Sequence, residues 1–389
     1  MLDHYFKRYT EISFILSFAM YLILPIIGPY IKSLGYNNTE VGLIFAVMPL
    51  TIIIFIPIIG NLSDKIGRKN MLCFAIIAEI IAFGLYYYDT YLACVIIARM
   101  LDAIAVAALP LLTLAKIEDH IKENRGHLGG IFLSVRFIGK LVAPLAGGLL
   151  ADYYFTKFPF LVSIVVLGVL LIILAMESKF RIKGITKADF NPFADIKKFI
   201  SFRDLRVTAF LGICAHAMIP ASNLFLPIYI IEKLSLSNTH VGFALFILGG
   251  THAFQGYFGR IGDRTGHAKN VITGLVITGL SFCAIFFVKG YILLLIVLFI
   301  QGIGRSIWNV SAWTLMSEIG EKIEKEGLVI SSYLSIAKIG ALLSFFLSGL
   351  VMDSYSFQVL ALSVGIVLIF ASVIAYFSYT TEYMKGAVQ

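Results

Sequence analysis

Long apolar runs constrain this chain more than any other feature, because one membrane-spanning helix needs about 20 consecutive apolar residues. Twelve such runs follow one another along the 389 residues, separated by polar stretches. Hydrophobic residues make up 59% of the chain and charged residues only 14%, which is more apolar surface than a soluble domain of this length can bury. The sequence therefore predicts an all-α membrane protein with twelve transmembrane helices, at about 12–31, 41–60, 70–88, 91–114, 128–151, 158–177, 206–231, 240–259, 269–288, 291–317, 328–352 and 356–379.

The basic residues are distributed unevenly between the two sets of loops. The two termini and the loops after every second run hold 22 of the 31 Lys and Arg residues, whereas the opposite loops hold only four. Loops rich in Lys and Arg stay in the cytoplasm. We therefore expect a multi-pass protein of the cell membrane with both termini and the linker 178–205 in the cytoplasm. The first run is long enough to remain as a helix, so no cleavable signal peptide is expected.

Charge and cysteine usage argue against several other classes of protein. The net charge of +8 is spread over loops rather than gathered on one soluble face, so nucleic acid is not an expected partner. The four cysteines lie within apolar runs at unrelated spacings, which indicates packing residues rather than a disulfide or a metal site. The segment 193–200 of the linker is equally consistent with an amphipathic helix on the membrane surface and with a solvated tether.

A polar stretch between the second and third runs has a counterpart between the eighth and ninth. In each, a first glycine is expected to let helices approach closely, and a later glycine to supply the positive φ of a tight turn. The acidic residue between them suits a helix N-terminus, and the basic residues suit the cytoplasmic side. The residues concerned are Gly60, Asp64, Lys65, Gly67 and Arg68 in the first copy and Gly259, Asp263, Arg264 and Gly266 in the second.

This pattern resembles the G-x-x-x-D-[RK]-x-G-[RK]-[RK] loop signature of the major facilitator superfamily of secondary transporters. The second copy departs from it at His267, where Arg is usual. Other segments repeat as well: 38–42 matches 238–242, with Thr39 and Thr239 suited to helix N-caps, and the pair 148 and 152 matches 349 and 353. The resemblance implies two six-helix halves, 1–177 and 206–389, joined by the linker. It also implies a substrate site between the halves, alternating access, and loops that latch the cytoplasmic face.

Charged residues inside the third and fourth runs are candidates for proton coupling, because charge at this depth is costly unless it is paired or hydrated. Arg99 and Asp102 share one helical face and are close enough to pair. The alternative, which the pairing itself favours, is a static brace of the helix. Glu79 is the other deep acid, and it either carries a proton, faces another helix of its own half, or reaches toward the interface.

The fifth run contains small residues whose spacing resembles the G-x8-G-x3-G-P-x2-G-G motif of the drug-efflux antiporters. Ala143 is its one departure. The small residues are expected to permit close packing and the proline to kink the helix, although glycine and proline are common in membrane helices generally. The motif residues are Gly130, Gly139, Pro144, Gly147 and Gly148.

Basic residues outnumber acidic ones inside the predicted helices. A cavity that hydrates these cations would favour anionic or zwitterionic amphiphiles over lipophilic cations. Packing against lipid or helices is the alternative for the aromatic candidates, and a hydrogen-bonded core position is expected for His216 and His252. The cavity candidates are Arg136, Lys140, Arg305, Lys338, Trp308, Tyr21 and Phe225.

These observations predict a monomeric secondary transporter in the lipid bilayer, most like the proton-coupled efflux branch of the superfamily. Its expected partners are a small amphiphilic substrate or drug and protons, with neither cofactor nor metal. Uptake or flipping of an anionic solute or lipid is the alternative within the same class. An intramembrane enzyme would need a constellation of nucleophile, base or metal ligands that the sequence does not display, and a non-transporting membrane sensor also fits the topology.

Overall fold

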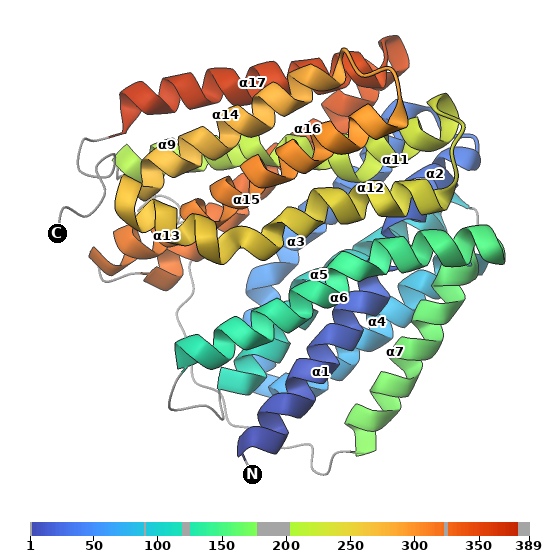
Figure 1. Cartoon of the computed structure of the whole chain (residues 1–389). Helices are drawn as coiled ribbons and strands as arrows, with labels where there is room; N and C mark the ends of the chain where they lie inside the picture. Colours follow the sequence, from blue (N-terminus) through green and yellow to red (C-terminus); the bar gives the residue numbers. More distant parts are fainter. Residues whose placement is uncertain (1, 89–90, 119–124, 177–202, 323–325, 380–389) are drawn as a thin grey trace. The chain divides into compact units, whose positions relative to one another are not determined.

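The computed structural model describes residues 2–88, 91–118, 125–176, 203–322 and 326–379. Within these ranges the chain forms helices and turns without a β-strand, which confirms the predicted all-α class (Figure 1). Of the predicted linker 178–205, only the last three positions are described. The long helices are α1 (Leu2–Tyr21), α2 (Leu24–Ser33), α3 (Asn38–Ile66), α4 (Arg68–Tyr88), α5 (Leu92–Glu118), α6 (Arg125–Tyr153), α7 (Phe158–Met176), α9 (Arg203–His216), α12 (Asn238–Gly250), α13 (Gln255–Thr265), α14 (His267–Ile285), α15 (Tyr291–Lys322), α16 (Glu326–Ser354) and α17 (Phe357–Ser378).

The chain divides into two compact units. Unit 1 contains Met1–Tyr36, Val47–Asp189 and Ile230–Phe246. The residues of unit 2 are Asn37–Ala46, Phe190–Tyr229 and Ile247–Gln389. Each unit therefore includes a short segment from the other half of the sequence: the start of α3 belongs to unit 2, and most of α12 belongs to unit 1.

The two units use the same helix pairings. In unit 1, α4 packs along α5 and α7, while α1 packs along α6 and α7 (Figure 1). In unit 2, α14 packs along α15 and α17, while α9 packs along α16 and α17. These helices occupy corresponding positions in the two halves of the sequence, so five helices of each half repeat the same pairings.

Three of the predicted transmembrane helices are interrupted. The first bends at residues 22–23, just before Pro25, whose ring nitrogen has no hydrogen to donate to the helix. The seventh passes from α9 through α10 (Met218–Pro220) and α11 (Leu226–Ile228), with π-helical turns at Ala221–Phe225 and Tyr229–Lys233. The eighth is split between α12 and α13 by a 3₁₀ turn, Thr251–Phe254, that follows two adjacent glycines, which are poor helix formers.

The interruption of the eighth helix changes the predicted number of uninterrupted spans. Among the described residues, eleven helical segments are each long and apolar enough to cross a membrane. The twelfth predicted span, 240–259, is the helix that the 3₁₀ turn divides, and neither α12 nor α13 is long enough to cross a membrane alone.

Two aspartates, each at the last turn of one helix, hold the first residues of another. In unit 1, the Asp152 carboxylate on α6 accepts from the backbone N–H and side-chain amide of Asn238, at 3.1 and 2.8 Å, and from the N–H and hydroxyl of Thr239, at 2.7 and 2.6 Å. In unit 2, Asp353 on α16 accepts from the N–H of Asn38 and from the N–H and hydroxyl of Thr39, at 2.8, 2.8 and 2.6 Å. We call these contacts the unit 1 clamp and the unit 2 clamp.

The clamps show that the predicted helix caps at Thr39 and Thr239 are wrong. The hydroxyls of Thr39 and Thr239 donate to a carboxylate, so they do not cap their own helices as expected. Asn37 precedes α3, where it exchanges two 2.8 Å hydrogen bonds with Glu40 in a capping box. A carboxylate from another helix is favoured at the threonines because it accepts several of the N–H groups left free at a helix N-terminus and faces the positive end of its dipole.

Glycines permit backbone contact at equivalent places in both units. A Cβ on Gly139 of α6 would meet the carbonyl oxygen of Phe14 at 2.6 Å, and one on Gly340 of α16 would overlap the carbonyl oxygen of Ile213. Gly147 and Gly148 likewise face backbone atoms of Leu22 and Asn238. These contacts confirm the close packing predicted from the fifth-run motif.

Two of the predicted close approaches are wrong. A Cβ on Gly130 would have no neighbour within 4 Å, because this end of α6 is exposed. A Cβ on Gly259 would meet only Val310 Cγ2, at an ordinary 3.5 Å. The helix α6 also continues through Pro144 without a break.

Candidate functional site

Unit 1 buries both signs of charge between α4 and α5. Arg99 Nη1 lies 2.9 Å from Asp102 Oδ2, and the two residues are only 4% and 5% exposed. Glu79 on α4 is fully buried within electrostatic range of both, and the Tyr86 side chain faces Arg99. We call these four residues the α4–α5 charge cluster. It confirms the predicted contact between Arg99 and Asp102, and it shows that Glu79 faces another helix of its own unit.

Simple helix geometry explains how the sequence builds this cluster. Arg99 and Asp102 are three residues apart on α5, and Glu79 and Tyr86 are seven apart on α4, so each pair shares one helix face. The ring of Phe160 on α7 packs against Tyr86, with centroids 5.8 Å apart, and thereby holds that side of α4. Both oxygens of Glu79 are buried without a hydrogen-bond partner among the described residues.

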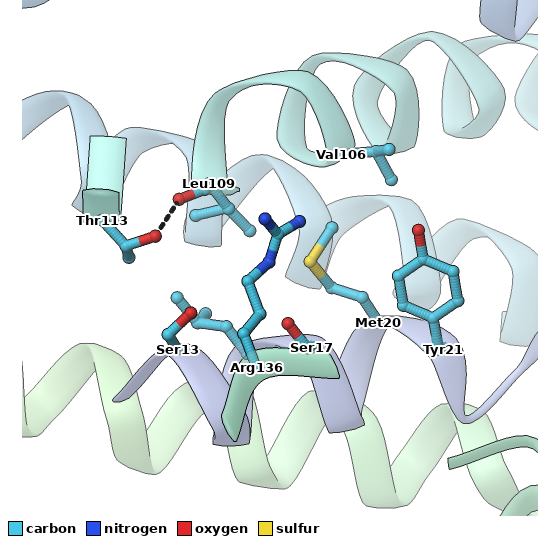
Figure 2. Close-up of a pocket in the computed structure, with 9 residues that line it drawn as sticks. Ser13, Ser17, Met20, Tyr21, Val106, Leu109, Thr113 and Arg136 are labelled. Carbon is cyan, nitrogen blue, oxygen red and sulfur yellow. Dashed lines mark hydrogen bonds between the residues drawn. The ribbon is translucent and has the colours of Figure 1, made fainter. Parts of the chain in front are cut away.

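A hollow in unit 1 lies between α1, α5 and α6. Figure 2 shows Arg136 extending from α6 into this space, with its guanidinium group between Met20 and Leu109. The hollow encloses about 280 Å³, including the open space at its mouth. Polar groups line it beside Arg136: Ser13, Ser17, Tyr21 and Thr113.

Lys140 adds a second cation next to this hollow. It lies one turn beyond Arg136 on α6, and its Nζ sits 4.6 Å above the centre of the Tyr21 ring. The structure thus brings together Arg136, Lys140 and Tyr21, all predicted from the sequence. The polar lining of α1 was not predicted, although Ser13, Ser17 and Tyr21 recur every fourth residue and so mark one face of a helix.

Unit 2 gathers cations around an aromatic pair. The His216 ring, at the end of α9, packs against the Trp308 ring on α15 in a T-shaped arrangement, with centroids 6.1 Å apart and planes at 82°. His216 Nδ1 donates to the carbonyl oxygen of Gly212 at 2.8 Å, which confirms the predicted hydrogen-bonded core histidine. Arg305 on α15 and Lys338 on α16 both lie within electrostatic range of His216. Phe225, the remaining aromatic candidate, is fully buried in the π-helical turn.

The two polar loop motifs are described to different extents. Gly67 and Gly266 have φ values of +90° and +93°, as predicted. In the second motif, His267 Nε2 lies 3.2 Å from Asp263 Oδ1 and 3.5 Å from Glu318 Oε1. His267, the departure from the loop signature, therefore makes the carboxylate contacts there. Arg264 is exposed, Arg68 is partly buried at the start of α4, and the side chains of Gly60, Asp64 and Lys65 lie outside what the structure describes.

Comparison with known proteins identifies the family. A family model described as Major Facilitator Superfamily matches residues 12–251 and, in a second match, residues 208–388. The chain belongs to the major facilitator superfamily. The nucleoside transporter NupG has the same fold, with a TM-score of 0.81 at 14% identity over 96% of this chain and all of that one. A transporter of the POT family, solved with 5-aminolevulinic acid, gives a TM-score of 0.79 at 12% identity over 96% of both chains.

Relatives in sequence agree with this membership. A multi-drug resistance efflux pump PmrA homolog of Lactococcus lactis is 27% identical over 320 residues, which cover 77% of this chain and 76% of the relative. The multidrug resistance protein MdtG of Salmonella arizonae is 24% identical over 370 residues, covering 91% and 90%. The predicted resemblance to the efflux branch of the superfamily is confirmed, and the chain is a membrane transporter.

Proposed function

We propose that this protein exports amphiphilic small molecules in exchange for protons, by alternating access. The observation that carries the proton-coupled part is the α4–α5 charge cluster. Support for export comes from relatives that are named multidrug efflux pumps, and from a 30% identity over 159 residues to a tetracycline resistance protein of Pasteurella multocida. The same relatives favour export over the uptake or flipping of an anionic solute or lipid.

The α4–α5 charge cluster has the composition of a one-proton carrier. Two carboxyl groups, Glu79 and Asp102, share one permanent cation, Arg99, in a buried environment. Burying an uncompensated charge costs several kcal/mol, so the cluster is most stable when one proton makes its net charge zero. Access of water to this region from the other side of the membrane would release that proton. Arg99 would then be shared between two carboxylates, and the change in its pairing couples the proton to helix movement.

The two clamps suit the moving parts that alternating access requires. The moving bodies in this proposal are the sequence halves 1–177 and 206–389. Asp152 belongs to the first half and Asn238 and Thr239 to the second; for Asp353 and Thr39 the assignment is reversed. Asp152 and Asp353 each precede a loop of the set opposite to the termini, so both clamps must break when the halves separate at that end of the spans. With the termini in the cytoplasm, this end faces the outside of the cell.

The orientation belongs to the same proposal, and so does action as a monomer in the cell membrane. It is tested by impermeant thiol labelling of intact cells, in a variant whose four native cysteines are replaced by alanine. A cysteine introduced within the linker 178–205 should stay unlabelled, and Lys289→Cys, in an exposed loop on the opposite side, should label readily. Labelling of the linker cysteine at the rate of the Lys289→Cys variant would reverse the orientation.

Purified protein in liposomes tests proton-coupled export directly. Tetracycline serves as the probe, the liposome lumen is acidic, and trapped pyranine reports the lumenal pH. We expect accumulation above the level of protein-free liposomes, together with proton loss from the lumen. Asp102→Asn and Glu79→Gln should keep probe binding and lose uphill accumulation, whereas Glu232→Gln, at an exposed carboxyl group, should leave both intact. Uphill transport that survives both cluster substitutions would remove the proton role of the cluster.

A further inference from the structure

Unit 2 contains a group of cationic and aromatic side chains that the proton-coupling cluster does not use. Arg305 and Trp308 are three residues apart on α15 and share a helix face, while Lys338 comes from α16 and His216 from α9. The helix α15, which carries Arg305 and Trp308, packs closely on α14, because Gly274 of α14 lies directly against the α15 backbone at Gly304 and Trp308. We call Arg305, Trp308, Lys338 and His216 the α15 cation site.

The two charged residues of this site, Arg305 and Lys338, are both cations. Among the described residues, the charged groups within electrostatic range of His216 are the two cations Arg305 and Lys338. Among the residues that the structure describes, Glu79 and Asp102 are the buried carboxylates, and both belong to unit 1. A guanidinium group inside a membrane protein without a carboxylate is costly, and an anion that enters the site removes that cost.

Trp308 gives a second, independent indication that a ligand belongs here. The residue is 8% exposed, and its indole Nε1–H has no hydrogen-bond acceptor among the described residues. A buried indole N–H normally finds an acceptor. The His216 ring packs beside the Trp308 ring, with centroids 6.1 Å apart, and its Nδ1 already donates to the carbonyl oxygen of Gly212.

We propose that the α15 cation site binds the carboxylate of an anionic aromatic substrate, and that this protein therefore prefers such anions to lipophilic cations. The proposal rests on the proposed export function and names the class of molecule exported. Arg305 can hold a carboxylate through two parallel N–H donors, and Lys338 adds a point charge. The Trp308 N–H donates to the same anion, and its ring supplies an apolar wall for the aromatic part of the ligand.

A lipid headgroup could supply an anion to the same side chains, so the test separates it from a soluble substrate. Three matched probes share a nitrophenyl ring that quenches tryptophan emission: the carboxylate 4-(4-nitrophenyl)butanoate, its uncharged amide, and the trimethylammonium cation with the same ring and chain. The protein contains two tryptophans, and Trp313→Phe leaves Trp308 as the only emitter. Quenching is titrated on this full-length protein in neutral detergent, with and without phosphatidylglycerol.

We expect the carboxylate to bind at least tenfold more tightly than the amide or the cation. Arg305→Gln and Lys338→Gln should each weaken carboxylate binding about tenfold, and Lys289→Gln, which removes an exposed cation of unit 2, should not change it. Equal binding of the three probes by the Trp313→Phe protein would overturn the proposal without any further variant. Competitive displacement of the carboxylate by phosphatidylglycerol would also overturn it, by assigning the site to a lipid headgroup.

These measurements need no proton gradient, so they are independent of the liposome assay. Anion-selective binding without gradient-driven transport would leave the α15 cation site intact and contradict proton-coupled export. Gradient-driven transport with cation-selective binding would support proton-coupled export and contradict the assignment of the α15 cation site. Arg305→Lys refines the assignment, because it keeps the charge but loses the planar pair of donors, and it should recover only part of the affinity lost in Arg305→Gln.

Discussion

Unit 1 and unit 2 pack their helices in the same pairs but bury different charges. In unit 1, α4 and α5 enclose Glu79 and Asp102 with Arg99 between them. In unit 2, the matching helices α14 and α15 enclose no carboxylate among the described residues, and α15 instead presents Arg305. A repeated fold therefore fixes where helices meet without fixing the chemistry placed there.

One pair of equivalent positions shows how the difference arises. Glu79 is twelve residues beyond Gly67, and Thr278 is twelve residues beyond Gly266. Both side chains are fully buried. The Thr278 hydroxyl donates to the carbonyl oxygen of Gly274 in its own helix at 2.8 Å, so it needs no partner from α15. A carboxylate cannot donate to that carbonyl when ionised, and the acid in unit 1 depends on its proton and on α5.

The largest expected effect comes from moving the unit 2 residue into unit 1. Glu79→Thr should abolish proton-driven accumulation, as Asp102→Asn should, because one cation then faces one carboxylate and no proton is needed for neutrality. Arg305→Gln should keep the accumulation ratio but raise the half-saturating concentration of an anionic probe about tenfold. Transport kinetics in liposomes measure both quantities. Loss of coupling in Arg305→Gln, or its retention in Glu79→Thr, would break the division between the units.

A smaller effect, on folding, tests whether the two units are packed alike. Gly139→Ala in unit 1 and Gly340→Ala in unit 2 should each destabilise the protein by about 1–3 kcal/mol, because the new methyl group meets a backbone oxygen that cannot move aside. Thermal unfolding in detergent measures the loss. Gly130→Ala, on the same helix as Gly139 but in open space, is the matched control. Equal stability of Gly130→Ala and Gly139→Ala would contradict the packing of unit 1.

The smallest effect concerns the clamps, which are exposed to solvent. Asp152→Asn should speed amide hydrogen exchange at Asn238 and Thr239 about fivefold, the equivalent of about 1 kcal/mol, because it removes the charge from these hydrogen bonds. Asp353→Asn should affect the start of α3 less, since the Asn38 side chain there donates to the Met352 carbonyl oxygen instead. Each variant serves as the control for the other. A Thr39 region that responds more than the Thr239 region would reverse the ranking.

The sequence predicted those features that depend on neighbours along one helix. Arg99 and Asp102 pair because they are three residues apart, and Arg136 and Lys140 share a face because they are four apart. The interruption within the predicted span 240–259 was not predicted. Its composition is apolar enough for a helix, but hydropathy does not register that two adjacent glycines precede a 3₁₀ turn.

The sequence patterns did not predict which side chains make contact between different helices. The repeat drew attention to positions 152 and 353, but nothing in it indicated that their carboxylates hold the starts of α12 and α3. His267 departs from the loop signature, yet its ring contacts Asp263 near the end of α13 and Glu318 on α15. Spacing alone also could not separate Gly139, which faces a backbone oxygen, from Gly130, which faces open space.

The sequence by itself determined an all-helical membrane protein with a repeated half, because apolar length, residue periodicity and loop charge act locally or as sums along the chain. The transporter class came from the resemblance of its two loop motifs to those of the major facilitator superfamily. The tertiary structure decided which charges meet. Glu79 becomes part of a shared ion cluster only because α4 packs on α5, and Trp308 meets His216 only because α15 lies near α9. Charge pairing inside a membrane depends on distances of a few ångströms between helices, and these are set by how the helices pack.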